Sequence, residues 1–112
     1  MRLPNAENAI VSTEKLRDYI LSQDHPEGAH KAAVFAAAGY RQDNWWRLRR
    51  DLKALAASHD AHELIPTVHG RKFEVRGALH GPLDMLNVVT IWIVLSRERF
   101  PRFVTAYPQR KR

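Results

Sequence analysis

The sequence of 112 residues contains no cysteine. A disulfide-stabilised scaffold, a thiol nucleophile and a thiolate zinc site are therefore excluded. Internal repeats and low-complexity tracts do not occur either. The composition that remains, with 45% hydrophobic and 27% charged residues, is ordinary for a soluble globular protein.

Long hydrophobic runs are also missing. None approaches the roughly 18 to 20 residues needed to span a bilayer, and the longest, over residues 88–95, has the length of a strand. The N-terminal residues MRLPNAEN contain no apolar stretch followed by a small-residue cleavage site, so no secretory signal is evident. We therefore expect a protein that acts in the cytoplasm and does not enter a membrane.

Acidic residues are in the minority, with 12 Asp and Glu against 18 Lys and Arg, which gives a net charge of +6. The basic excess is uneven, because residues 1–40 hold four basic and five acidic side chains, whereas residues 41–112 hold fourteen and seven. Arginine outnumbers lysine by thirteen to five, and guanidinium groups make forked contacts with phosphate. This distribution predicts a surface that faces a polyanion. The charge alone leaves open a basic protein without a nucleic-acid partner.

The chain length bounds the architecture. At 112 residues the chain can bury one core beneath one sheet, and we expect a single domain over residues 1–112. We predict mainly helix over residues 1–60, mainly strand over residues 61–108, and a basic tail over residues 109–112. Because the helices precede the strands, the predicted fold class is α+β, in which two to three N-terminal helices pack on a three- to four-stranded antiparallel β-meander.

Three helices are predicted in the first half of the chain. Residues 13–22 form a short amphipathic helix behind a Ser-Thr N-cap. Pro26 begins a second helix, which continues through a run of alanines until Gly39 ends it. A third helix begins near Gln42. Its apolar stripe consists of Trp45, Leu48, Leu52 and Leu55.

Strand periodicity appears in the second half. Phe73 and Val75 alternate with charged residues, which indicates a strand with one apolar and one charged side. Residues 88–95 are apolar at nearly every position, which is typical of a central strand covered on both faces. Residues 102–107 are predicted to form a last strand, and a short strand near residues 64–68 would complete four.

Alternation along the strands sorts their side chains into two faces. With a tight turn near Glu98, we expect Trp92 opposite Thr105 and Thr90 opposite Tyr107. The face expected beneath the helices consists of Phe73, Val75, Ile91, Ile93, Val104 and Ala106. The face expected to stay open consists of Lys72, Glu74, Arg76, Thr90, Trp92, Phe103, Thr105 and Tyr107. Aromatic rings can stack on bases while cations hold phosphates, so this open face has a composition suited to RNA.

Among the strand cations, Arg76 is the preferred phosphate ligand. A turn near residues 80–85 places Arg76 roughly abreast of Thr90 and Tyr107, whereas Lys72 lies about 13 Å away along the strand. The alternative is a solvated strand face whose charges pair with one another, which contributes ~0 to 1 kcal/mol to stability.

His30 and Lys31 are the candidate catalytic pair of the helical part. A histidine near pH 7 can act as base and acid, and an adjacent lysine can stabilise phosphate charge. Both lie early in the alanine-rich helix, whose positive end favours a phosphate. The alternative for His30 is an exposed helix residue without a catalytic role. His59 and His62 have a helix-compatible spacing for a metal, but the helix is predicted to end there, so we expect no metal site.

Several segments resemble a bacterial family that is described as a domain of unknown function. These are LPNAENAIV near the N-terminus, HPEGAHKAAVFAAAGY, and VVTIWIVL followed by PRFVTAYP. The resemblance covers nearly the whole chain. The order of helices and then a basic β-meander, which closes on Thr-Ala-Tyr-Pro, also resembles the wider superfamily of barnase-, EndoU-, colicin- and RelE-like ribonucleases. Members of that superfamily are toxins of toxin–antitoxin pairs or C-terminal parts of secreted polymorphic toxins.

The ribonuclease resemblance implies RNA cleavage without metal or cofactor, in which the ribose 2′-OH attacks the adjacent phosphorus and leaves a 2′,3′-cyclic phosphate. The candidate catalytic residues that it implies are His30, Lys31, Arg76, Thr105 and Tyr107. The candidate nucleic-acid contacts are Arg71, Lys72, Thr90, Trp92 and Arg102. The chain lacks the paired strand histidines of the EndoU type and an evident carboxylate–histidine pair of the barnase type, which leaves the general base open.

The leading hypothesis is thus an endoribonuclease toxin that binds RNA and is neutralised by a small acidic antitoxin or immunity protein. His30 would exchange protons, Lys31 and Arg76 would stabilise the phosphorane, Thr105 would position the substrate, and Tyr107 would stack on it or hydrogen-bond to it. Delivery as part of a larger secreted toxin is an alternative to a stand-alone cytoplasmic protein. Two further alternatives are a non-catalytic nucleic-acid-binding module and a basic adaptor that binds an acidic partner.

Overall fold

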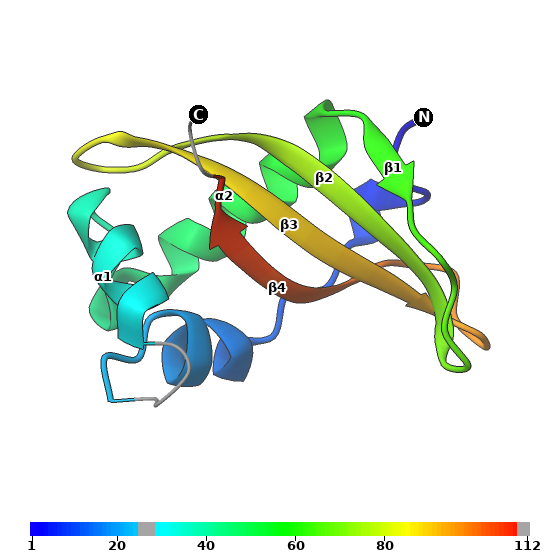
Figure 1. Ribbon diagram of the computed structural model, residues 1–112, viewed down its shortest axis with the longest axis horizontal. Coiled ribbons are helices and arrows are strands. Elements are labelled where there is room, and N and C mark those ends of the chain that lie inside the picture. The colour runs from blue at the N-terminus through cyan, green and yellow to red at the C-terminus, as the bar shows by residue number, and fades with distance from the viewer. Residues whose placement is uncertain (25–28, 110–112) are drawn as a thin grey trace.

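The computed structural model describes residues 1–24 and 29–109, in which short helices precede the strands (Figure 1). The elements are η1 (Ala6–Asn8), η2 (Lys15–Ile20), α1 (Ala29–Ala37), η3 (Gln42–Asn44), α2 (Trp45–Ser58), β1 (Ala61–Glu63), β2 (Gly70–His80), β3 (Met85–Leu95) and β4 (Arg102–Pro108). The strands form one antiparallel sheet in the order β1-β2-β3-β4. The predicted α+β class is confirmed.

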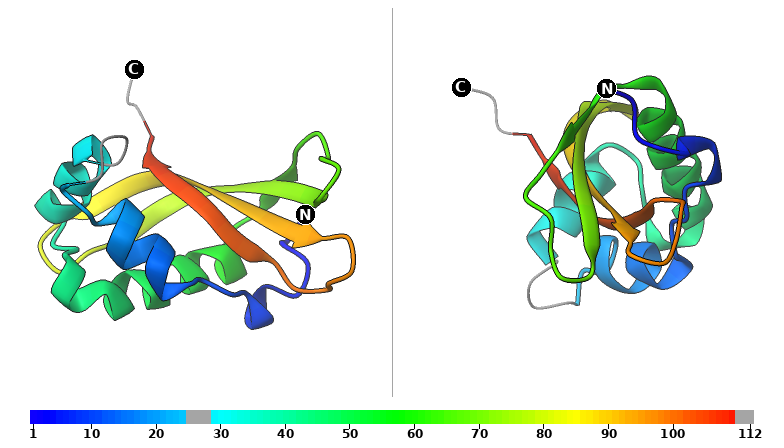
Figure 2. Two further views of the ribbon diagram at one scale, coloured as in Figure 1. Left: turned by 90° about the horizontal axis from the view of Figure 1, so that it is seen from below. Right: turned by 90° about the vertical axis from the view of Figure 1, so that its right-hand side faces the viewer.

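The helices of the first half pack on one face of the sheet. In Figure 2, η2 and α2 lie on one side of the strands and α1 lies at the end of the sheet, where the Leu83 N–H of the β2–β3 turn donates to the Ala38 carbonyl at 3.0 Å; the described chain places no helix against the middle of the opposite face. Of the four residues predicted as the apolar stripe of α2, Leu48, Leu52 and Leu55 are buried and Trp45 is half-buried. None of the described helices combines the length and the apolar character that a bilayer-spanning helix requires.

The predicted helix boundaries agree in part with the structure. The first predicted helix exists, but its central six residues form a π-helix, and the Ser12 hydroxyl accepts the backbone N–H of Lys15 at 3.2 Å, as a capping side chain does. The predicted start of the second helix at Pro26 lies outside the described residues. Gly39 follows α1 with φ of +101°, a conformation that favours glycine.

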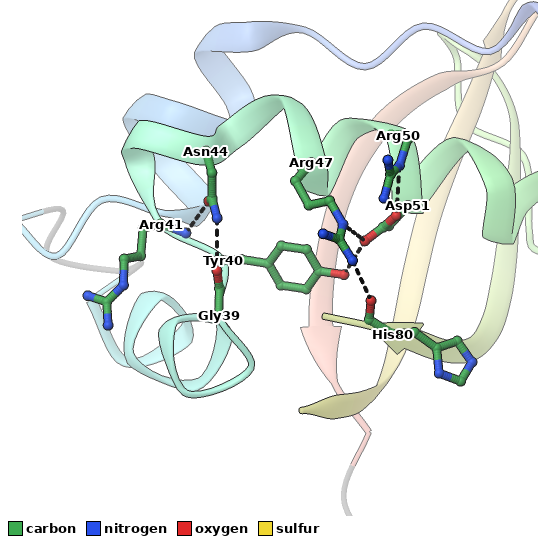
Figure 3. Close-up of polar contacts among 8 residues, drawn as sticks. All are labelled: Gly39, Tyr40, Arg41, Asn44, Arg47, Arg50, Asp51 and His80. Carbon is green, nitrogen blue, oxygen red and sulfur yellow. Dashed lines mark hydrogen bonds and ion pairs between the residues drawn. The ribbon is translucent and has the colours of Figure 1, made fainter. Parts of the chain in front are cut away.

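A partly buried hydrogen-bond network joins the segment after α1, helix α2 and the end of β2 (Figure 3). The hydroxyl of the fully buried Tyr40 donates to Asp51 Oδ2 at 2.6 Å. Arg47 Nε also donates to this oxygen at 3.3 Å, and Arg47 Nη2 donates to the backbone carbonyl of His80 at 3.4 Å. Burial, and then the hydrogen bond to Asp51, raise the pKa of Tyr40, so the hydroxyl stays protonated and donates. The network therefore fixes the position of α2 relative to the sheet.

The strand predicted near residues 64–68 is wrong. The first strand is β1, at Ala61–Glu63, and the chain then turns back at Thr67, whose N–H donates to the carbonyl of Gly70 at 3.0 Å. Ile65 and Val68 point into solvent with 88% and 91% exposure. Pro66 between them has no backbone N–H for a strand ladder. The segment connects β1 to β2 and forms no strand of its own, although the N–H of Leu64 still donates to the carbonyl of Lys72 at 2.9 Å.

The faces of β3 are the reverse of the prediction. Thr90 and Trp92 are fully buried on the helix-covered face, where they oppose Val75 and Phe73 of β2. They are therefore not nucleic-acid contacts. The physical reason is that an indole ring buries a large apolar area. Burial leaves no polar group unpaired, since Trp92 Nε1 donates to Thr90 Oγ1 in the core at 2.8 Å. As predicted, the middle of β3 is buried over residues 88–92, and this includes Val89 and Ile91 on the face that the described helices leave open.

A β-bulge then separates the two halves of β4. Trp92 pairs with Phe103, but the preceding residue Ile91 pairs with Thr105, so Val104 is left as the extra residue of β4. The predicted pairs of Trp92 with Thr105 and of Thr90 with Tyr107 are wrong, because the register differs by two residues beside the turn, where Trp92 pairs with Phe103, and by one residue beyond the bulge, where Thr90 pairs with Ala106. Phe103 is buried beside Trp92, whereas Thr105 and Tyr107 reach the open face.

Candidate functional site

The open face of the sheet brings polar side chains into rows. Directly opposed residues on neighbouring antiparallel strands point to the same face, with Cβ atoms about 5 Å apart. The rows on this face are Lys72–Ile93–Arg102, His62–Glu74–Ile91–Thr105 and Arg76–Val89–Tyr107. The middle rows thus place basic, acidic and hydroxyl groups on either side of an apolar strip formed by β3.

Lys31 of α1 reaches the edge of this face at β4. Its Nζ donates to Thr105 Oγ1 at 3.3 Å and lies 5.8 Å from the centre of the Tyr107 ring. The same ammonium lies 5.6 Å from the ring centre of Tyr19. Cations at such distances are attracted to the ring face, which holds the lysine between the two tyrosines. Three of the predicted catalytic residues, Lys31, Thr105 and Tyr107, therefore meet.

The contact between α1 and β4 borders an open cleft of about 590 Å³. The cleft is lined by Glu14, Lys15, Tyr19, Lys31, Val104 and Thr105. Lys15 Nζ donates to the backbone carbonyl of Val104, the bulge residue, at 3.1 Å. Lys15 was not a sequence candidate, because no local pattern reveals that a bulge in β4 turns a carbonyl toward it. Two ammonium groups, those of Lys15 and Lys31, thus line the cleft.

Arg76 lies on the same face, two strands away from Tyr107. Val89 is the register partner of both, so the Cα atoms of Arg76 and Tyr107 are about 10 Å apart. Arg76 Nε lies 3.2 Å from Glu74 Oε2. The hydrogen bond and the charge of Glu74 raise the pKa of Arg76, with a smaller contribution from Tyr107.

A second, smaller cleft adjoins Arg76 at the other edge of the sheet. It measures about 400 Å³ and is lined by Met1, His59, Asp60, Ala61, His62, Glu74 and Arg76. His62 is the register partner of Glu74. The sequence drew attention to His62 only as a possible metal ligand, since its pairing with Glu74 depends on where β1 begins. Among the described residues, no group of three or more His, Asp or Glu side chains is arranged to hold a metal ion.

Residues 2–110 match the family described as Domain of unknown function (DUF6883). The chain belongs to this family. A search of curated proteins gives no significant match. Among solved structures, a chain of the "Contact-dependent growth inhibition toxin - immunity protein complex from Klebsiella pneumoniae 342" is similar, with a TM-score of 0.66 and 12% sequence identity. The alignment covers 95% of this chain and 97% of that chain, so the similarity is one of the whole fold.

The other predicted residues of this DUF6883 domain lie outside the cleft at β4. His30 is exposed, and among the described residues the cleft includes Lys31 but not this neighbour. The reason is helical geometry, since successive residues point about 100° apart around the axis. The catalytic role of His30 stays a prediction.

The three remaining cations have different surroundings. Arg71 shares a face with Phe73, over whose ring its guanidinium lies at 5.1 Å, and it binds Glu63 through two hydrogen bonds of 2.9 and 2.8 Å. It therefore points away from the open face and is not an alternative to Arg76 there. Lys72 lies on the open face, one row from Glu74. Arg102 lies in the same row as Lys72, on the other side of β3. Its Nε and Nη2 each donate to a carboxylate oxygen of Glu98 at 2.7 Å.

Proposed function

We propose that this DUF6883 domain is an endoribonuclease toxin that cleaves RNA without a metal ion and is neutralised by an immunity protein. The observation that carries the proposal is the contact of Lys31 with Thr105 and with the ring of Tyr107 beside one cleft, with Arg76 on the same sheet face. Two cations, a hydroxyl and an aromatic ring are the groups that phosphodiester and base recognition require.

The reaction follows from these groups. The ribose 2′-oxygen attacks the adjacent phosphorus, the P–O5′ bond breaks, and the products carry a 2′,3′-cyclic phosphate and a 5′-hydroxyl. Lys31 and Arg76 stabilise the negative charge that develops on the phosphorane. The Thr105 hydroxyl accepts from Lys31 Nζ and donates its own hydrogen to a phosphate oxygen, while Tyr107 stacks on a base.

Fold and charge together support a toxin. The similar fold belongs to a chain of a complex between a contact-dependent growth inhibition toxin and its immunity protein. The net charge of +6 suits the member of such a pair that meets RNA. A protein that covers a basic face needs complementary acidic charge, so we infer an acidic immunity protein. The place of action is then the cytoplasm, where the RNA is.

Purified protein and a defined oligoribonucleotide in the presence of EDTA test the proposal. Cleavage that leaves a 2′,3′-cyclic phosphate, with no cleavage of the 2′-deoxy analogue, is the expected result. Binding of the oligoribonucleotide that falls steeply with salt and leads to no turnover would refute catalysis and favour a non-catalytic RNA-binding module.

Arg76 and Arg71 offer a matched pair of variants on one strand. Arg76→Ala removes a guanidinium from the open face, and we expect kcat to fall by about 10²- to 10³-fold, as for the loss of one group that stabilises a transition state. Arg71→Ala removes the same charge from the opposite face, where Glu63 holds it, and we expect wild-type activity. Equal losses in both variants would show that overall charge, rather than this site, determines activity.

A further inference from the structure

The bulge in β4 presents two acceptor oxygens on consecutive residues, and each of them binds a lysine ammonium. Lys15 Nζ donates to the backbone carbonyl of Val104 at 3.1 Å, and Lys31 Nζ donates to the Thr105 hydroxyl at 3.3 Å. Lys15 belongs to η2 and Lys31 to α1, so two separate helices supply the cations. In the described part of the chain, these are the lysines whose ammonium groups hydrogen-bond to another segment. The bulge therefore gathers two positive charges at one point of the sheet edge.

Both ammonium groups keep donors for a ligand. A lysine ammonium has three N–H donors, and each of these two lysines directs one of them at β4. Within the described residues, neither lysine forms an ion pair with a carboxylate. Lys15 is exposed, Lys31 is half-buried, and both line the open cleft of about 590 Å³. An anion that enters this cleft can therefore accept hydrogen bonds from both.

The contacts with β4 also restrain the two lysine side chains. A lysine in water samples many rotamers, and the loss of this freedom on binding opposes affinity. Lys31 is restrained further by two aromatic rings, because its Nζ lies 5.6 Å from the ring centre of Tyr19 and 5.8 Å from that of Tyr107. Since contacts within the protein already order these side chains, little of their entropy is lost when an anion binds.

The charge of the cleft favours a phosphodiester. Its lining carries the two ammonium groups and one carboxylate, that of Glu14, so positive charge is in excess. Ammonium groups form strong hydrogen bonds with phosphate oxygens, because donor and acceptor are both charged. Tyr107, whose ring centre is 5.8 Å from Lys31 Nζ, lies beside a phosphate bound there and can stack on a neighbouring base. A nucleic-acid strand is therefore the anion that fits both the cations and the ring.

We infer that one phosphate of the RNA strand binds between Lys15 and Lys31, and that Lys15 is a substrate-binding residue of the proposed ribonuclease; the inference rests on the proposed function for the identity of the ligand. One phosphate oxygen accepts a hydrogen bond from Lys15 Nζ, and another accepts one from Lys31 Nζ. Because Lys15 contacts the phosphate rather than a base, it contributes affinity for every RNA sequence. The bulge in β4 is then the part of the fold that sets the separation of the two cations.

Binding of the 2′-deoxy analogue, which cannot be cleaved, tests the inference apart from catalysis. Lys15→Gln keeps an N–H that can donate to the Val104 carbonyl but removes the charge. We expect this variant to bind about 5- to 30-fold more weakly at low salt, as for the loss of a hydrogen bond between charged groups at an exposed site. Lys15→Arg keeps the charge and should bind nearly like the wild type. Lys53→Gln, the matched control, removes the same charge from α2 outside the cleft and should have a clearly smaller effect.

The salt dependence of binding shows whether the two lysines share one phosphate. The slope of log K against log salt changes by about 0.7 for each phosphate of a single strand that the protein ceases to neutralise. The double variant Lys15→Gln, Lys31→Gln should therefore have a slope that is shallower by about 0.7. A change of about 1.4 would assign the lysines to two phosphates and overturn the shared site. Glu14→Gln should tighten binding, because it removes the negative charge of the cleft.

Failure of this inference and failure of the proposed function give different results. If Lys15→Gln binds the 2′-deoxy analogue as tightly as Lys53→Gln does, while the wild type cleaves RNA, the inference is overturned and the proposed function stands. If the wild type binds the analogue through Lys15 and Lys31 but cleaves no RNA, the proposed function is overturned and the phosphate site stands.

Discussion

Replacement of Thr90 by valine tests the burial that removed Thr90 and Trp92 from the RNA-binding face. Thr90 Oγ1 donates to the carbonyl of Val75 at 2.7 Å and accepts from Trp92 Nε1 at 2.8 Å, and both side chains are fully buried. Among the described residues, every buried side-chain polar atom has a hydrogen-bond partner. Valine has nearly the shape of threonine, so Thr90→Val removes both hydrogen bonds and leaves the indole N–H unpaired in the core.

The magnitude follows from these two losses. A hydrogen bond between neutral groups contributes about 1 kcal/mol, and an unpaired buried donor costs about 1 to 3 kcal/mol. We therefore expect Thr90→Val to lower the free energy of unfolding by about 2 to 4 kcal/mol, a large part of the total for a domain of this size. The melting temperature should fall by roughly 8 to 16 °C, at about 4 °C per kcal/mol for a domain of this size.

Urea unfolding followed by far-ultraviolet circular dichroism measures this change, and Thr105→Val provides the matched control. Thr105 lies on the open face, so its replacement should change the free energy of unfolding by about 0.5 kcal/mol or less while lowering RNA cleavage. Thr90→Val should show the reverse pattern, with normal cleavage at a temperature where the variant is folded. A Thr90→Val variant of wild-type stability that binds RNA weakly would refute the burial of this side chain.

Two further predictions concern stability. Tyr40→Phe removes the buried hydroxyl that donates to Asp51 at 2.6 Å. Urea unfolding should show that the free energy of unfolding falls by about 1.5 to 3 kcal/mol, as for the loss of a hydrogen bond to a charged group. A fall of less than about 0.5 kcal/mol would contradict a stabilising role of this network. Arg102 lowers the pKa of Glu98, so this pair stabilises the fold above the unfolded pKa of about 4.3 and ceases to do so as the pH falls through the lower folded value. The difference in urea midpoint between Glu98→Gln and the wild type should therefore be present at pH 7 and vanish in acid, and a difference independent of pH would exclude this origin.

Periodicity in the sequence was sufficient for much of the fold. The stripe at Leu48, Leu52 and Leu55 predicts the buried side of α2, because residues three or four apart share one face of a helix. Alternation likewise places Arg76 on the charged side of β2, because successive strand residues point in opposite directions. The α+β order follows from these local patterns alone.

Local patterns were insufficient where a strand is apolar at every position. Such a strand satisfies either assignment of its faces, so residues 88–95 do not reveal that Thr90 and Trp92 point into the core. A bulge adds one residue to one strand without a sequence signature, and that shift determines that Thr105 stands on the open face while Phe103 is buried.

For the candidate site, too, the sequence determined one part and the tertiary structure the other. The residue types that suit RNA, and the segments that carry them, were evident from the sequence by itself: Lys31 in a helix, Arg76 in an early strand, Thr105 and Tyr107 in the last strand. Tertiary structure alone decided that Lys31 meets Thr105, across 74 positions of sequence, and that Lys15 meets the carbonyl of Val104. The physical reason is that these contacts depend on the rotation of α1 against β4 and on the bulge in β4, which long-range packing sets and no local periodicity encodes.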